Sequence, residues 1–200
     1  MIKAVAFDLD GTITRPFLNF ARIRLEIGVP MARDSLLDKI AAMPAPERER
    51  ASAILARHEE DAAENAELND GVLELMSYLS SRGLKSAVVT RNSEQSTQFV
   101  LDKLGLEFDR VITRDSGLPL KPDPAALIAL AKEWDIATRE LMMVGDFRYD
   151  VDCGRAAGSP TCLVTNGREN GDDCGADYEV KSPAEVIAVL RRLHEPGAQG

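Results

Sequence analysis

The first fourteen residues, MIKAVAFDLDGTIT, constrain the fold of this chain more than any other segment. Residues 2–7 are apolar except for Lys3, which predicts a buried strand. Asp8 and Asp10 follow at the C-terminal end of that strand, and Gly11 lets the chain turn sharply. Ligands bind at this end of the strands in an open α/β sheet. The segment therefore predicts either a ligand site or a simple acidic turn.

The closeness of the two carboxylates favours a ligand site over a simple acidic turn, because such a pair needs a cation. Two carboxylates held this close repel each other unless a positive charge lies between them. Carboxylate oxygens suit a hard divalent metal, and Mg²⁺ is the ion that we expect.

The remainder of the chain after residue 68 alternates between strand patterns and helix patterns. Strands are expected over 84–89, 111–113, 141–144, 161–164 and 177–180, and helices over 70–81, 92–104, 124–134, 149–158 and 183–194. This alternation predicts an α/β fold with a doubly wound parallel sheet of Rossmann-like type. A Gly- and Asp-rich loop is expected over 165–176, and the tail over 195–200 is expected to be frayed.

Polar residues are expected to cap the first two of these helices. Asn69 or Asp70 stands before the first apolar position of the helix over 70–81. Asn92 and Gln95 have the spacing of a capping box.

The segment over 15–68 has no strand signal. Helical patterns occupy 16–28, 32–42 and 47–68. One interpretation is an oversized crossover that belongs to the main layer. A crossover needs only about a dozen residues, so we favour a small all-helical cap inserted into a core formed by 1–14 and 69–200.

Composition narrows the range of partners. Lys and Arg number 24 and Asp and Glu number 33, which gives a formal net charge of −9. Nucleic acid is not expected as a partner, because a phosphate backbone needs a basic face. A small phosphorylated substrate remains compatible, since a metal ion and one or two local cations can reverse the field inside a cleft.

Cysteine usage predicts the compartment. The chain has an odd number of cysteines, namely Cys153, Cys162 and Cys174. Their spacing matches no zinc site, and no signal peptide precedes them. We therefore expect free thiols in a cytoplasmic protein. No apolar run approaches the roughly 18 residues that span a membrane, so no membrane partner is expected.

Four predicted strand ends carry reactive side chains. These ends meet at one rim of a parallel sheet. The residue types suit phosphoryl transfer from a monoester: a carboxylate attacks phosphorus, a metal and a lysine neutralise charge, a hydroxyl holds the phosphate, and a second acid protonates the departing alcohol. The candidates are Asp8, Asp10, Thr90, Lys121, Asp146 and Asp150.

These motifs resemble those of the haloacid dehalogenase superfamily of phosphohydrolases. The segment DLDGT over 8–12 matches the first motif, Thr90 the second, Lys121 the third and GDFRYD over 145–150 the fourth. The two longer segments are specific to this superfamily. The single Thr and Lys are informative only because they follow the first motif in the same order as in the family. The insert has the position of the helical cap in the phosphoglycolate phosphatase-like subfamily.

The resemblance implies a role for each acid. Asp8 would be the nucleophile that becomes an aspartyl phosphate and would also bind Mg²⁺. Asp10 would be the general acid and then the base, and its backbone carbonyl would bind the metal. Asp146 would be a metal ligand, and Asp150 a weaker one, directly or through water. Capping of the following helix is the alternative for Asp146 and Asp150.

The resemblance also implies phosphate and substrate contacts. Thr90 would hydrogen-bond the phosphate, and Lys121 would pair with both Asp8 and the phosphate. Arg91 and Asn92 adjoin the site and are candidates for substrate binding, with helix capping as the alternative for Asn92.

The resemblance implies a Mg²⁺-dependent phosphatase that hydrolyses a small phosphorylated metabolite through an aspartyl phosphate. One alternative is a phosphomutase of the β-phosphoglucomutase type, which shares the intermediate. A receiver-like phosphoacceptor module is a further alternative of another class. We expect a monomer by default.

Overall fold

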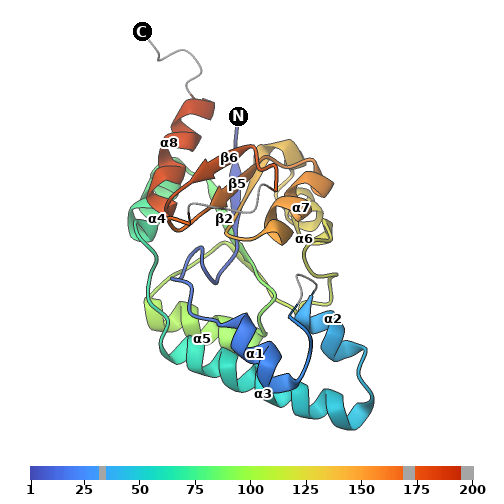
Figure 1. Ribbon diagram of the computed structural model, residues 1–200. Helices are drawn as coiled ribbons and strands as arrows, with labels where there is room; N and C mark the ends of the chain where they lie inside the picture. Colours follow the sequence, from blue (N-terminus) through green and yellow to red (C-terminus); the bar gives the residue numbers. More distant parts are fainter. Residues whose placement is uncertain (32–34, 169–173, 195–200) are drawn as a thin grey trace. The chain divides into compact units, whose positions relative to one another are not determined.

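The computed structural model describes residues 1–31, 35–168 and 174–194, and the chain in it divides into two compact units (Figure 1). The core unit comprises Met1–Pro16 and Glu67–Gly200, and the insert unit comprises Phe17–Ala66. That the insert acts as a cap stays a prediction. The start of the helix expected over 32–42, the middle of the loop expected over 165–176 and the tail over 195–200 lie outside the described residues.

The core unit is built on a six-stranded parallel sheet in the order β3-β2-β1-β4-β5-β6. The predicted α/β fold with a parallel, Rossmann-like sheet is thereby confirmed. The strands are β1 (Ala4–Phe7), β2 (Lys85–Val89), β3 (Arg110–Ile112), β4 (Leu141–Gly145), β5 (Thr161–Val164) and β6 (Tyr178–Val180).

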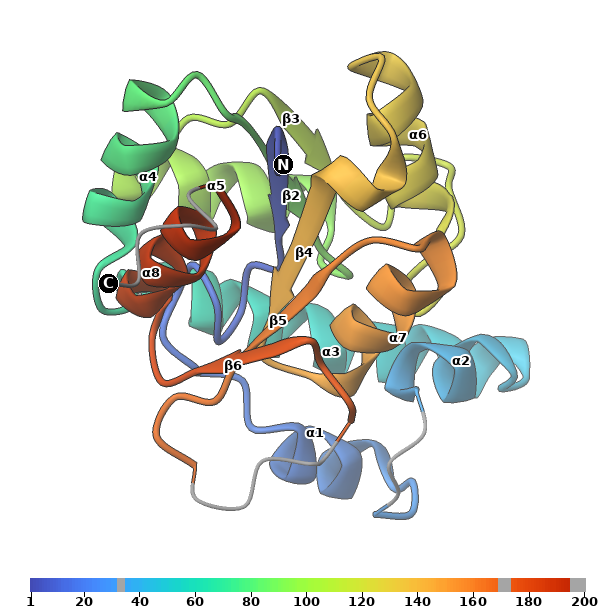
Figure 2. The same cartoon turned by 90° about the horizontal axis from the view of Figure 1, so that it is seen from above.

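Helices cover both faces of this sheet, as Figure 2 shows. One face carries α4, α5 and α8, and the other carries α6 and α7. All four residues of β1 are buried, which explains why its sequence is continuously apolar rather than alternating. The helices are α4 (Val72–Ser81), α5 (Glu94–Leu104), α6 (Ala125–Glu133), the short 3₁₀ helix η1 (Thr138–Glu140), α7 (Arg148–Ala157) and α8 (Pro183–His194).

The insert unit consists of α1 (Phe20–Ile27), α2 (Leu36–Ala41) and α3 (Ala45–Glu64). It has an apolar core of its own, which includes Ile23, Ile40 and Leu55. The first helix is shorter than expected, because Asn19 caps its start and Gly28 ends it in the left-handed conformation. Within the described residues, no helix of either unit is long and apolar enough to cross a membrane.

The expected cap of α4 by Asn69 or Asp70 was wrong. The residue before α4 is Gly71, and no side chain caps this helix. Asn69 is instead buried, and its Nδ2 donates to the carbonyl oxygens of Thr12 at 3.1 Å and Gly11 at 3.3 Å. Its own backbone N–H donates to the Ile13 carbonyl at 2.9 Å, so the segment returning from the insert is fastened to the turn after β1.

The expected capping role of Asn92 was also wrong. Ser93 is the N-cap of α5, and its Oγ accepts from the N–H of Ser96 at 3.2 Å. A hydroxyl in this position satisfies the end of the helix, so the side chain of Asn92 is available for another contact.

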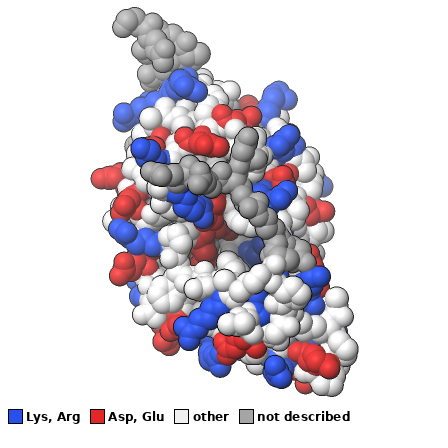
Figure 3. All heavy atoms as spheres, in the orientation of Figure 1, with Lys and Arg blue, Asp and Glu red and all other residues white. Residues whose placement is uncertain are grey.

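Charges of both signs are interspersed on the face of the molecule that Figure 3 displays. Each unit carries Lys and Arg beside Asp and Glu there, without a continuous basic area. The three cysteines are free thiols, as the sequence predicts.

A pair of neighbouring residues in α6 tests the packing of the core. Leu127 is fully buried against the sheet, whereas Ile128 is 48% exposed. Leu127→Ala should lower the free energy of unfolding by about 2–5 kcal/mol, because it removes packed atoms and leaves a cavity. The matched variant Ile128→Ala should change it by about 0.5 kcal/mol or less. Urea unfolding of both variants measures this, and equal losses would contradict the packing described here.

Candidate active site

Four ionisable side chains meet at the C-terminal ends of β1 and β4. Asp8 follows β1, Asp146 follows β4, and Asp150 lies in the first turn of α7. One carboxylate oxygen from each of the three lies within 4.8 Å of the other two. The Nζ of Lys121 donates to Asp8 Oδ1 at 2.5 Å and to Asp150 Oδ1 at 2.6 Å. The structure thus brings four of the predicted site residues into one cluster.

The charges in this cluster are strongly coupled because the cluster is buried. The side chain of Lys121 is only 3% exposed. Burial alone would lower the pKa of Lys121, but the carboxylates of Asp150 and Asp8 outweigh it and raise the pKa above its ordinary value. The lysine is therefore charged at neutral pH.

Two of the carboxyl groups are harder to ionise than usual. Burial, together with the neighbouring charges of Asp8 and Asp150, raises the pKa of Asp146 to about 8. Burial also raises the pKa of Asp150, although Lys121 opposes this effect. Three ionised carboxylates and one ammonium would leave two negative charges in the cluster. The donor set therefore fits a hard divalent cation with oxygen ligands.

Two glycines allow the backbone to lie directly against the carboxylates of Asp146 and Asp150. Gly11 has a φ of +80°, and a Cβ on it would lie 2.3 Å from Asp146 Oδ2. A Cβ on Gly145 would lie 2.1 Å from the Cγ of Asp150. A larger residue at either position would displace a carboxylate, which gives both glycines of the sequence motifs a steric reason.

A second group of polar side chains adjoins the cluster. The Nδ2 of Asn92 donates to Asp10 Oδ2 at 2.6 Å. The backbone N–H of Asn92 donates to the hydroxyl of Thr90 at 3.2 Å. Thr90 itself is buried directly after β2. Asn92 thus connects the residue that follows β2 with the turn that follows β1.

Arg91, another predicted substrate contact, stacks on an aromatic ring. Its guanidinium carbon lies 4.8 Å from the ring centroid of Tyr149, which in turn meets Phe147 edge-on at 5.1 Å. This contact joins the end of β2 to the start of α7. A role of Arg91 in binding substrate stays a prediction.

Two residues of the loop after β5 contact the site, and neither was predicted from the sequence. The Nη2 of Arg168 donates to the Asp146 carbonyl at 2.7 Å and to Asp146 Oδ2 at 3.3 Å. The Nδ2 of Asn166 donates to the Gly11 carbonyl at 2.7 Å, and this residue has a φ of +52°. No motif marks these positions, and only the turn-forming Asn-Gly pair over 166–167 was a local signal.

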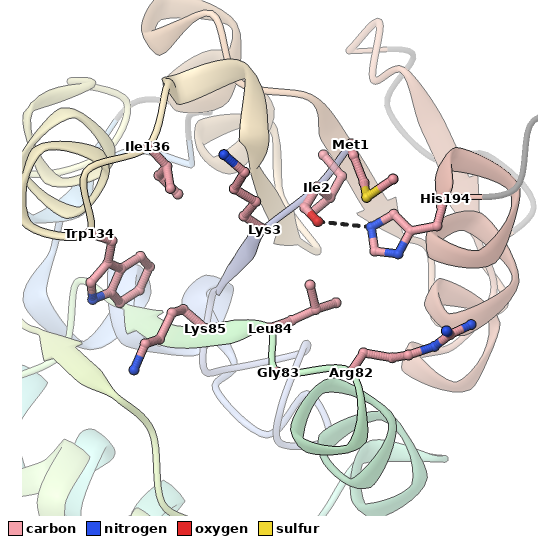
Figure 4. Close-up of a pocket in the computed structure, with 10 residues that line it drawn as sticks. All are labelled: Met1, Ile2, Lys3, Arg82, Gly83, Leu84, Lys85, Trp134, Ile136 and His194. Carbon is pink, nitrogen blue, oxygen red and sulfur yellow. Dashed lines mark hydrogen bonds between the residues drawn. The ribbon is translucent and has the colours of Figure 1, made fainter.

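A hollow of about 570 Å³ lies at the opposite ends of the strands (Figure 4). Trp134, Leu84 and Ile136 contribute apolar surface, and no carboxylate lines it. Its two lysines are already paired, Lys3 with Glu140 and Lys85 with Asp109. This hollow lacks the chemistry of the carboxylate cluster and lies at the end of the sheet where ligands are not expected.

Known proteins resemble the chain over nearly its whole length. The family model of haloacid dehalogenase-like hydrolases matches residues 2–158. An N-acetylmuramic acid 6-phosphate phosphatase from Pseudomonas putida is 30% identical, over 94% of this chain and 96% of its own length. A phosphoglycolate phosphatase from Thiobacillus denitrificans is 29% identical, over 96% of both chains. A β-phosphoglucomutase structure from Clostridium difficile superposes with a TM-score of 0.78 over 100% of both chains at 17% identity, which supports the fold alone.

The raised pKa of Asp146 predicts how a metal ion affects stability. Between the ordinary pKa of 3.8 and the folded value of about 8, the folded protein holds a proton that the unfolded chain has released. Without metal, this group therefore makes the fold less stable as the pH rises through that range. A divalent cation replaces the proton, so its stabilising effect should grow with pH.

Thermal unfolding with and without MgCl₂ at pH 5.5 and pH 8 measures this effect. At a hundredfold excess over Kd, the ion should raise Tm by about 5–10 °C at pH 8 and by much less at pH 5.5. Asp146→Asn should remove most of the increase. An equal increase at both pH values, or one that persists in Asp146→Asn, would contradict the assignment of this carboxylate to the metal site.

Proposed function

Because this chain belongs to the haloacid dehalogenase-like hydrolase family, we propose that it is a Mg²⁺-dependent phosphatase that acts on a small phosphorylated metabolite. The reaction proceeds through an aspartyl phosphate on Asp8. The observation that carries the proposal is the position of Asp8, whose Oδ1 accepts from Lys121 at 2.5 Å beside two further carboxylates.

Asp8 is the nucleophile in this proposal. Lys121 holds one of its two oxygens and so fixes the orientation of the carboxylate relative to β1. The ammonium group also neutralises charge on the phosphoryl group during transfer. Asp150 keeps Lys121 in place from the other side, at 2.6 Å.

Asp10 and Thr90 act on the substrate. Asp10 protonates the oxygen of the departing alcohol and later accepts a proton from the attacking water. Thr90 directs its hydroxyl toward the phosphate, and its rotation is restrained by the N–H of Asn92 at 3.2 Å.

Mg²⁺ would be held by Asp8, Asp146 and the backbone carbonyl of Asp10. Both oxygens of Asp150 already accept hydrogen bonds, from Lys121 and from the N–H of Phe147 at 3.1 Å, which favours a contact through water. When bound, the ion supplies positive charge to the phosphoryl oxygens.

The relatives support a phosphorylated metabolite of low molecular weight as the substrate. The names of two of them specify phosphoglycolate and N-acetylmuramic acid 6-phosphate. The insert unit would be the cap that screens substrates and excludes water. The net charge of −9 makes nucleic acid a poor candidate.

Release of inorganic phosphate from a panel of phosphorylated metabolites, with p-nitrophenyl phosphate as a generic ester, tests the proposal. Asp8→Asn should reduce turnover below detection, because it removes the enzyme's nucleophile and the uncatalysed hydrolysis is very slow. Asp10→Asn should lower the rate roughly 10²–10⁴-fold. The matched control Asp102→Asn, at an exposed position of α5, should retain full activity. Near-native turnover by Asp8→Asn would refute the mechanism.

A phosphomutase is the second candidate, because the β-phosphoglucomutase structure shares the fold along the whole chain. It would return the phosphoryl group from Asp8 to a sugar. Incubation with a hexose 1-phosphate separates the two functions. Isomerisation without release of phosphate would favour the mutase, whereas release of phosphate alone supports the phosphatase.

A further inference from the structure

The contact between Asn92 and Asp10 has a shorter distance than most neutral hydrogen bonds. Asn92 Nδ2 lies 2.6 Å from Asp10 Oδ2, and both residues belong to the core unit although 82 positions separate them in the chain. Oδ2 can accept this hydrogen bond both when Asp10 is ionised and when it carries a proton on its other oxygen, and the bond is strongest to the ionised carboxylate. The contact therefore restricts the orientation of the Asp10 carboxylate.

The backbone of Asn92 is itself held on both sides. Its N–H donates to Thr90 Oγ1 at 3.2 Å, and its carbonyl accepts from the N–H of Arg114 at 3.0 Å. The next residue, Ser93, is locked as the N-cap of α5, where its Oγ accepts from Ser96 and its carbonyl accepts from Thr97. A side chain anchored in this way can hold its partner in one place.

Asp10 lies on a turn whose backbone is fixed separately. The N–H of Thr14 donates to the Leu9 carbonyl at 2.9 Å, and Asn166 Nδ2 and Asn69 Nδ2 hold the Gly11 carbonyl. These bonds fix the main chain but leave the side-chain torsions of Asp10 to be set by contacts of its carboxylate. Asn92 supplies such a contact.

We propose that Asn92 is a positioning residue that holds the carboxyl group of Asp10 for proton transfer to the leaving group. The inference rests on the proposed function. In the first half of the reaction, Asp8 forms a bond to phosphorus while the bond between phosphorus and the ester oxygen breaks. The electron pair goes to that oxygen, which takes the proton of Asp10. Correct placement of the proton donor matters because displacement by about 1 Å can reduce a rate by about 10².

The position of Asn92 explains why its predicted capping role was wrong, because Ser93 caps α5 and the Asn92 amide group is directed at Asp10. A direct contact of Asn92 with substrate stays a prediction. Its effect on the reaction is exerted through another residue. Loss of Asn92 should therefore harm substrates whose leaving group needs a proton much more than substrates whose leaving group does not.

Two substrates with different leaving groups test the proposal. Nitrophenolate is a stable anion that leaves without protonation, whereas the alkoxide of an alkyl phosphate requires a proton. The comparison uses kcat/KM, because this quantity covers the steps up to departure of the alcohol and excludes the later hydrolysis of the phosphoenzyme. The probes are p-nitrophenyl phosphate and the alkyl phosphate that the wild-type enzyme hydrolyses fastest in the metabolite panel.

Asn92→Ala should lower kcat/KM for the alkyl phosphate about 10–100-fold and for p-nitrophenyl phosphate only a few-fold. Asn92→Asp keeps the shape but replaces the N–H donor by a second carboxylate, so its effect should be at least as selective. Asp102→Asn, at an exposed position of α5 away from this contact, is the control and should leave kcat/KM for both substrates unchanged.

Equal losses for both substrates in Asn92→Ala, or wild-type behaviour of Asn92→Asp, would overturn the positioning role and leave the proposed phosphatase function intact. If the wild-type enzyme hydrolyses neither ester, the proposed function fails instead. Crystal structures of wild type and Asn92→Ala then decide the positioning role without turnover. The Asp10 carboxylate should change its rotamer in the variant, and an unchanged rotamer would overturn the inference.

Discussion

The two hydrogen bonds of Lys121 are the interaction on which the rest of the site depends. One buried ammonium group holds Asp8 at 2.5 Å and Asp150 at 2.6 Å, and so joins the end of β1 to the start of α7. Removal of the lysine would leave buried carboxylates without their internal counter-charge, which is far more costly than losing an exposed ion pair. The single lysine does not balance three carboxylates, and this remaining negative charge is the physical reason for a divalent cation.

The sheet and the carboxylate cluster could be predicted from the sequence because each depends on local signals. The continuous apolar run of β1 indicated a strand covered on both faces, and the parallel order then required that the ends of β1 and β4 lie at one rim. Asp8 and Asp146 came directly after those runs. Lys121 gained its importance from position alone, since the sequence could not show that its side chain would be buried between two carboxylates.

The contacts around the cluster could not be predicted, because they join side chains that are distant in the chain. Asn69 and Asn92 were expected to cap helices, and both donate instead to the turn over 9–14. Ser93 caps the start of α5, whereas α4 begins after a left-handed Gly71 without a side-chain cap, and neither outcome is visible in a single sequence. Arg168 approaches Asp146 from the loop after β5, where no motif indicated a role. These residues hold the reactive groups in place, whereas the motifs contain the reactive groups themselves.

The most direct test of the account is to find where the phosphoryl group resides during turnover. The enzyme is mixed with substrate and Mg²⁺, quenched in acid within milliseconds, digested and analysed by mass spectrometry. A phosphoenzyme on Asp8 predicts that the peptide containing residues 4–15 carries one additional phosphoryl group, located on Asp8, and that hydroxylamine removes it as expected for an acyl phosphate. A phosphoryl group on another residue, or phosphate release with none bound at any time point, would contradict the central role of Asp8.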